Sequence, residues 1–469
     1  MDADGSALSN ALRKQRRRRL WFGAVPGVAL LALAAAVGWR LEANRRTPPL
    51  NIPRPALPSP NAYGQFRAAA AKLEGRRHFF PNSMPNWSPA VETYATYAAA
   101  HRDAEPALRA LRAALATPYL EPPKRGLAGA GPLPAYARFR EMARTMAGDS
   151  RYLMASGRPR EAADRALDGV EMGVMVQHGS LIAWLVGQAI QAIALRQFAD
   201  MPPRMSAADL RHAARRWDAI EAKRVATVDV MREEGWASLS LQEDALRELD
   251  RGSLPARCRA AYAAVAIRPI LLEPANPFDE QAGPSFRERA SWALEAARLM
   301  LADRRALLLE DQRYHEAVAR AFASPGPASV RVKPSRLAAM SGAEEVIHDR
   351  LCMLDASARS MSALVRTQIA LGLYRADHGA FPASLADLAP TSMGRMLDDP
   401  FAAGPGTPLR YRRTAGGFLL YSLGPDRRDD GGTPQRRPTG QEDPGDLVAG
   451  RFWPDGKSYP ILGAPARRP

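Results

Sequence analysis

Apolar residues recur with a helical period over most of this chain. From Asn61 to about Phe322, segments rich in alanine and leucine are broken at clusters of proline and glycine, such as residues 117–134 and 273–285. Breaks of this kind are typical of loops between helices. We therefore expect one all-α domain over residues 61–323.

Two segments of this domain need a separate interpretation. Tyr152–Val174 is similar to one helix-turn-helix unit of tetratricopeptide-like arrays, and without a repeat period it predicts helical hairpins, of which a solenoid-like stack is one arrangement. Leu181–Phe198 is apolar enough to be taken for a membrane span. It also carries four polar residues that are costly in lipid, so we predict a core helix; they are Gln188, Gln191, Arg196 and Gln197.

The amino terminus joins a positive tail to a long apolar run. Residues 1–19 end in RKQRRRR, and residues 20–39 carry no charge. A helix of that length rises about 30 Å, the thickness of the bilayer interior. More positive charge precedes the run than follows it, which predicts a single-pass signal anchor in a bacterial inner (cytoplasmic) membrane, with the amino terminus in the cytoplasm and the bulk outside it. A cleaved signal peptide is the alternative, but the run is longer than its apolar region and lacks a clean cleavage site.

The remaining segments follow from changes in composition. Residues 40–60 form a proline-rich linker and residues 324–341 a second one, because proline-dense sequence holds neither helix nor sheet. In the carboxyl-terminal part, residues 342–469, a helical period predicts a long helix to His378, followed by a turn or short helix at Ser384–Leu388. Pro408–Arg413 and Phe418–Leu423 alternate as strands around the turn sequence TAGG. The expected fold class is mostly α: one N-terminal transmembrane helix, an all-α domain and a small C-terminal α+β domain with a loop-rich tail.

The residues of the C-terminal domain resemble a known family. The sequence ALGLYRADHGAFPASLADLAP (370–390) is followed by DDPF (398–401), PLRYR (408–412) and FLLYSLGPDRRDDGG (418–432). In order and spacing, residues 370–455 are similar to the C-terminal domain of the major pseudopilins of type II secretion. The resemblance implies a helix, a short sheet and a calcium-binding loop. The chain departs from the family because its predicted span lies far upstream and lacks the Gly-Phe-[Thr/Ser]-Leu-x-Glu processing site, so we do not expect pilin-like processing or polymerisation.

The resemblance also implies ligands for the calcium ion. They would be the Leu423 carbonyl and the Asp426 side chain, with Asp429 or Asp430 as a later carboxylate. Calcium takes six to eight oxygen ligands, and carbonyls and water can complete such a set. The alternative is that Gly424-Pro425-Asp426 is a turn, with Asp429 and Asp430 making Asx-type hydrogen bonds before two glycines. Both alternatives remain open from the sequence.

Composition and motifs narrow the function. The chain has 65 basic and 49 acidic residues, a net charge of +16, but the excess is arginine and no aromatic-interleaved basic stripe accompanies it, so we expect no nucleic-acid partner. Its two cysteines, Cys258 and Cys352, are expected to be buried and structural. We find no nucleophile, zinc or nucleotide motif. We therefore expect a non-enzymatic, membrane-anchored extracytoplasmic (periplasmic) scaffold or interaction protein with partners in secretion or envelope assembly; the alternative is an envelope enzyme or ligand-binding protein whose site lies in the helical domain.

Overall fold

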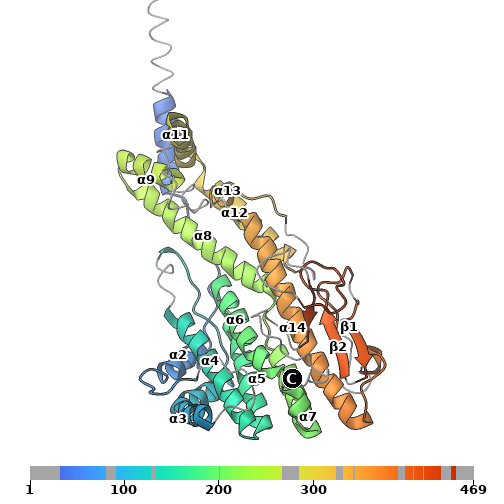
Figure 1. Ribbon diagram of the computed structural model, residues 1–469. Coiled ribbons are helices and arrows are strands. Elements are labelled where there is room, and N and C mark those ends of the chain that lie inside the picture. The colour runs from blue at the N-terminus through green and yellow to red at the C-terminus, as the bar shows by residue number, and fades with distance from the viewer. Residues whose placement is uncertain are drawn as a thin grey trace, which may run out of the picture. The chain divides into compact units, whose positions relative to one another are not determined.

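Helices dominate the computed structural model, and one small sheet follows the last of them (Figure 1). The structure describes residues 32–80, 91–127, 134–199, 201–266, 285–323, 331–341, 344–388, 397–404, 406–415, 417–434 and 445–449. Within these residues the predicted mostly α class with a small C-terminal sheet is confirmed. Residues 1–31, which hold the basic tail and much of the predicted span at 20–39, lie outside the described residues, and residues 32–45 are helical.

Contacts between residues divide the chain into two compact units. Unit 1 holds residues 1–52, 239–313 and 334–342, and unit 2 holds residues 53–238, 314–333 and 343–469. The partition differs from the segments drawn from the sequence, because residues 239–313 share a unit with the segment after the predicted span. Long helices cross the division: α8 (Thr227–Arg251) and α12 (Arg304–Ala321) contribute to both units.

Unit 1 is a small helical assembly. It contains helical residues 32–45, the second part of α8, α9 (Leu254–Ala266), α11 (Phe286–Leu301), the first part of α12, and α13 (Arg336–Ser341). α11 begins at a capping box, in which Ser285 and Glu288 satisfy each other's backbone N–H groups. The apolar core of unit 1 consists of two small clusters, one of Leu246, Leu299, Leu307 and Leu308 and one of Ala261, Ala296 and Met300.

Unit 2 begins with a larger helical region. Its elements are α2 (Ala62–Ala71), α3 (Val91–Ala114), α4 (Pro134–Ala155), α5 (Pro159–Val176), α6 (Leu181–Phe198), the 3-10 turn η2 (Pro202–Arg204) and α7 (Ala207–Glu221). α5 is buried along almost its whole length and contributes to both apolar clusters of the unit. α5 and α6 approach closely at Gly173 and Gly187, where a Cβ on Gly187 would lie 2.5 Å from the Gly173 carbonyl oxygen.

The apolar segment that includes α6 is the one candidate membrane span that length and composition identify among the described helices. It covers Leu181–Arg204, and 56% of its most apolar window is buried inside the structure. Ala183, Ile190, Leu195 and Phe198 contribute to the apolar clusters of unit 2. This burial supports the prediction of a core helix.

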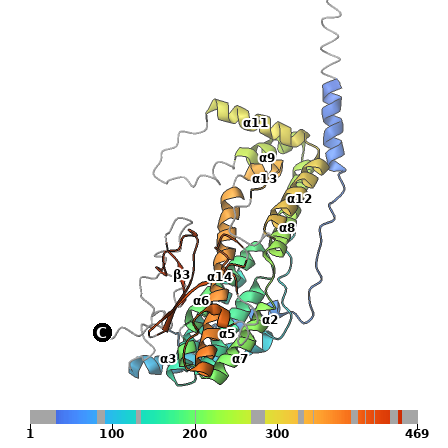
Figure 2. The same ribbon diagram turned by 90° about the vertical axis from the view of Figure 1, so that its right-hand side faces the viewer.

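The C-terminal part of unit 2 packs on one long helix. α14 (Glu344–His378) agrees with the predicted helix, and the 3-10 turn η3 (Leu385–Leu388) with the predicted short helix. β1 (Arg410–Thr414) and β2 (Gly417–Ser422) form the predicted hairpin, with Thr414 paired to Gly417. β3 (Leu447–Val448) joins the other edge of β2, and the sheet lies beside α14 (Figure 2). α14 ends where Gly379 adopts a φ of 78°, the left-handed conformation that glycine allows after a helix.

Candidate functional site

Two of the four segments that carry the family resemblance, residues 398–401 and 418–432, meet at the carboxylate of Asp399. Its Oδ1 accepts hydrogen bonds from the Ser422 hydroxyl at 2.6 Å and from the Phe401 amide at 3.0 Å, and its Oδ2 accepts one from the Leu423 amide at 3.0 Å. The side chain is buried, and Phe401 beside it is fully buried. Asp399 therefore links the DDPF segment to the end of β2, where the aspartate loop begins. Sequence analysis noted this motif but assigned Asp399 no role.

The second residue of the aspartate loop, residues 423–432, is a glycine that cannot be replaced without strain. Gly424 has a φ of 73°, and a Cβ there would lie 2.6 Å from the Gly445 carbonyl oxygen. Asp426 follows: its Oδ1 accepts from the Arg428 amide at 3.2 Å and its Oδ2 from the Gly445 amide at 3.3 Å. The Asp426 carboxylate thus holds the loop to the segment that enters β3.

Asp429 and Asp430 have different surroundings. Asp429 accepts hydrogen bonds from the Tyr421 hydroxyl at 2.8 Å, the Gly431 amide at 3.1 Å and the Arg410 guanidinium at 3.3 Å. The Tyr421 hydrogen bond is the main reason that the pKa of Asp429 lies below its ordinary value. The Asp430 carbonyl accepts from the amide and hydroxyl of Thr433. The turn alternative expected Asx-type hydrogen bonds from Asp429 and Asp430. Asp429 makes one with the Gly431 amide, Asp426 makes another with the Arg428 amide, and Asp430 contacts Thr433 through its backbone carbonyl instead.

Asp446 is a further carboxylate at this loop that sequence analysis missed. It is buried, its Oδ2 accepts from the Gly432 amide at 2.7 Å, and its Oδ1 has no hydrogen-bond partner among the described residues. Burial raises the pKa of Asp446 to about 6, and the negative charges of Asp429 and Asp430 add to the shift. Burial of a charged carboxylate oxygen without a hydrogen-bond partner costs free energy, and protonation or a bound cation removes that cost.

The fit of this loop to calcium can be judged from its donor set. Asp426, Asp429, Asp430 and Asp446 supply enough oxygens by chemistry. Within the part of the chain that the structure describes, however, no three acidic, histidine or cysteine side chains converge on a point that could hold a metal ion. Asp426 and Asp429 instead bind backbone amides, a tyrosine and an arginine. As arranged here the residues do not fit the ion, and calcium at Leu423, Asp426, Asp429 and Asp430 stays a prediction from the resemblance.

The helical region contains a histidine-carboxylate pair, the kind of contact that an enzyme could use. His101 Nδ1 lies 2.5 Å from Asp149 Oδ1, and Arg165 donates to the other oxygen of Asp149 at 2.7 Å. The Tyr152 ring contacts the His101 ring in a tilted arrangement, with 4.8 Å between the ring centroids. Asp149 is fully buried, and its arginine partner neutralises it, so the group is a buried ion pair between α3, α4 and α5.

A cavity of about 300 Å³ also lies in unit 2, between α6, the start of α8 and α14. Its lining includes Trp184, Arg224, Arg359 and Gln177. Gln177 is fully buried, and neither its amide nitrogen nor its amide oxygen has a hydrogen-bond partner among the described residues. Each buried donor or acceptor that lacks a hydrogen-bond partner costs about 1 to 3 kcal/mol of stability, so a polar ligand that bonds to the Gln177 amide would remove this cost.

Comparisons with known proteins add no assignment to these observations. No family model, no curated protein and no solved structure matches the chain. The function is therefore argued from the sites themselves.

Proposed function

We propose that this protein is a non-enzymatic scaffold or interaction protein, anchored in the bacterial inner membrane by residues 20–39, that assists secretion or envelope assembly through its pseudopilin-like C-terminal part. The observation that carries the proposal is the hydrogen bonding of Asp399 to Ser422 and Leu423. It joins two segments of the family signature that are separated in the sequence. The contact between these two segments supports the view that the residues of the signature form one structural module.

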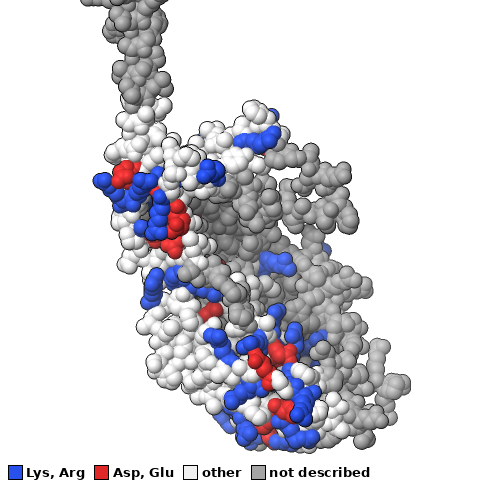
Figure 3. Space-filling model, turned by 90° about the vertical axis from the view of Figure 1, so that its left-hand side faces the viewer, with Lys and Arg blue, Asp and Glu red and all other residues white. Residues whose placement is uncertain are grey.

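Two further features support an interaction role. The long helix α14 carries the hairpin on one side and packs against α7 of the helical region, so the C-terminal part is built onto a larger helical body. On the face drawn in Figure 3, lysine and arginine side chains lie among aspartate and glutamate side chains. On this face the coloured side chains form no continuous positive stripe of the kind that a phosphate backbone binds, and mixed charge is suited to protein partners.

The experiment has a topology arm and a function arm. In the first, alkaline phosphatase or β-galactosidase is fused after residue 469, and the extracytoplasmic location predicts phosphatase activity without galactosidase activity. In the second, a deletion strain is complemented with the full chain or with the Asp399→Ala variant, and the secreted proteins in the medium are quantified against a cytoplasmic lysis marker. We expect the full chain to restore secretion and the variant to fail. Galactosidase activity at the carboxyl end, or unchanged secretion in the deletion strain, contradicts the proposal.

The unpaired Gln177 favours a second candidate function, the binding of a small ligand in the helical region. The cavity would suit a molecule with amide and carboxylate groups, because Gln177 offers an amide, and Arg224 and Arg359 offer the guanidinium donors that their pairs with Glu221 and Asp355 leave unused. Acetyl-diglycine carries both groups and serves as the probe. Saturable binding to the wild type and its loss in Gln177→Leu are expected from this function, and equal binding to both proteins contradicts it.

A further inference from the structure

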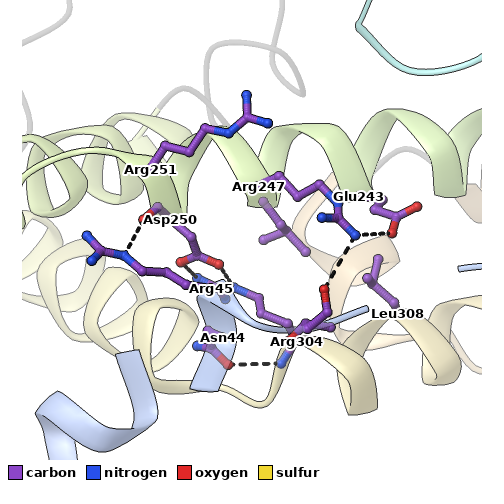
Figure 4. Close-up of a pocket in the computed structure, with 10 residues that line it drawn as sticks. Asn44, Arg45, Glu243, Arg247, Asp250, Arg251, Arg304 and Leu308 are labelled. Atoms are coloured by element: carbon purple, nitrogen blue, oxygen red, sulfur yellow. Dashed lines mark hydrogen bonds and ion pairs between the residues drawn. The ribbon is translucent and has the colours of Figure 1, made fainter. Parts of the chain in front are cut away.

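Unit 1 contains a polar cavity of about 380 Å³ beside the segment that follows the predicted membrane span. Residues 44–47 form one wall, α8 forms another, and α12 closes the third (Figure 4). The volume is within the range of small-molecule pockets. Four of the lining side chains are arginines and two are carboxylates, so the cavity has an excess of positive charge; they are Arg45, Arg247, Arg251, Arg304, Glu243 and Asp250.

One arginine and one carboxylate of this cavity satisfy each other. Arg304 is buried and donates to both oxygens of Asp250, at 3.0 and 3.1 Å. Asp250 also accepts from Arg257 at 2.8 Å, and Arg304 donates a further hydrogen bond to the Leu299 carbonyl. These residues form a buried ionic cluster that fixes α8, α9 and α12 around the cavity floor. Neither Arg304 nor Asp250 is available to hold a ligand.

The second carboxylate is engaged as well. Glu243 accepts hydrogen bonds through its Oε1 from the Leu50 amide at 2.9 Å and from Arg247 at 3.0 Å. It therefore ties the segment after the span to α8 and neutralises part of the charge of Arg247. Both lining carboxylates are therefore engaged. Arg45 lies 3.8 Å from a carboxylate oxygen of Glu42 and Arg251 pairs with Glu248, and neither glutamate lines the cavity.

The three remaining arginines retain hydrogen-bond donors. Arg45 donates to the carbonyls of Asp250 at 2.9 Å and of Gly252 at 3.4 Å, and Arg247 donates to the Thr47 carbonyl at 3.5 Å besides Glu243. Arg251 pairs with Glu248, and in Figure 4 its guanidinium points away from Asp250. A guanidinium has five N–H donors in a planar fork, which matches the oxygens of a phosphoryl group. The bonds made within the cavity leave part of each fork unused.

We propose that this cavity binds a phosphoryl group, held by Arg45 and Arg247. The ligand that its position favours is the phosphodiester of an anionic phospholipid headgroup. Arg45 lies six residues after the predicted span ends at Trp39, so the cavity wall begins where the chain would leave the bilayer. The choice of a lipid as the source rests on the proposed membrane anchor, whereas the phosphoryl chemistry rests on the arginines alone.

The test uses the full chain in neutral detergent and measures ligand adducts by native mass spectrometry. The probes are inorganic phosphate and two short-chain lipids, dihexanoyl-phosphatidylglycerol and dihexanoyl-phosphatidylcholine, both used below the concentration at which they form micelles. We expect the phosphatidylglycerol adduct to form and Arg247→Gln to weaken it at least tenfold, the loss expected when a charge-assisted hydrogen bond is removed. Arg45→Gln serves as a second variant, for which we expect a similar loss; the Arg45 side chain is partly exposed, and its partners are Glu42 and the carbonyls of Asp250 and Gly252.

Arg259→Gln is the matched control. Arg259 is an exposed arginine of α9 in the same unit, outside the cavity lining, and its substitution changes the net charge equally. Unchanged phosphatidylglycerol binding by this variant supports the proposal, and an equal loss overturns it. Binding of phosphatidylcholine as tight as that of phosphatidylglycerol, or no adduct with either phosphatidylglycerol or phosphate, also overturns it. Arginine-dependent binding of inorganic phosphate alone supports the phosphoryl site and assigns it a soluble ligand. None of these results depends on the reporter fusion or the secretion assay, so the two proposals fail separately.

Discussion

Replacement of Asp399 by alanine tests the contact that organises the C-terminal part. The carboxylate is 3% exposed and accepts three hydrogen bonds, from Ser422, Phe401 and Leu423. In Asp399→Ala these buried donors lose their acceptor, and each unmet donor costs about 1 to 3 kcal/mol, less where water enters the space left by the side chain. We expect a local loss of about 3 to 5 kcal/mol in the stability of the sheet and the aspartate loop.

Hydrogen exchange measured by mass spectrometry on the full chain reports this loss locally. Peptides that cover β2 and residues 423–434 should exchange at least about a hundredfold faster in Asp399→Ala, while peptides from α5 keep their protection, because a local opening leaves distant helices closed. Asp398→Ala is the matched control, since Asp398 is the exposed neighbour and accepts one hydrogen bond, from the Gly406 amide at 3.1 Å. Equal exchange of β2 in the two variants would refute the reasoning, because burial and hydrogen bonding would then not distinguish the two aspartates.

Three further predictions concern pH, helix packing and calcium. Burial raises the pKa of Asp446 from an ordinary 3.8 to about 6, so the stabilisation from its protonated form is complete below the pKa of an unfolded aspartate and is lost as the pH rises through about 6. The melting temperature of Asp446→Asn should therefore rise relative to that of the wild type between pH 4 and 7. A difference in melting temperature that stays constant over this range contradicts the prediction. Gly187→Ala should cost about 1 to 3 kcal/mol in thermal unfolding because its Cβ meets the Gly173 carbonyl, whereas Gly64→Ala in α2, where a Cβ meets nothing within 4 Å, should gain about 0.5 to 1 kcal/mol. Because the residues of the aspartate loop as arranged do not fit the ion, calcium at about millimolar concentration should leave the melting temperature of the full chain unchanged; a rise in the wild type that Asp426→Ala abolishes would contradict this and support the calcium site that the resemblance implies.

The elements that the sequence predicts well are those specified by neighbouring residues. The helical period over residues 342–378 predicts α14, and the sequence TAGG between two alternating runs predicts the hairpin of β1 and β2. Gly379 and Gly424 mark turns that need a positive φ, and both stand in the quoted motifs. Local chemistry was sufficient in each case because the pattern and the structure involve the same short segment.

The features that the sequence did not predict depend on distant partners. β3 is only two residues long, which is too short to show an alternating strand pattern. It pairs with β2 although the aspartate loop and the residues after it separate the two strands in the sequence. Asp398 and Asp399 are identical side chains in adjacent positions, and only the fold decides that Asp399 meets Ser422. Cys258 was expected to be buried like Cys352, and this was wrong: Cys258 lies on the exposed side of α9, because the apolar period of a short helix does not determine which residues a neighbouring helix covers.

The arginine content illustrates how composition and structure must be combined. A net charge of +16 alone would suggest a nucleic-acid partner, yet buried arginines form internal ion pairs, such as Arg165 with Asp149 in unit 2 and Arg304 with Asp250 in unit 1. An internal ion pair cancels one positive and one negative charge, so it leaves the net charge unchanged, but its arginine is no longer available to an external partner. The arginines that remain available are then informative by position. Arg45 and Arg247 line one cavity whose own carboxylates are already engaged, and this local arrangement, unlike the total charge, predicts a particular kind of ligand.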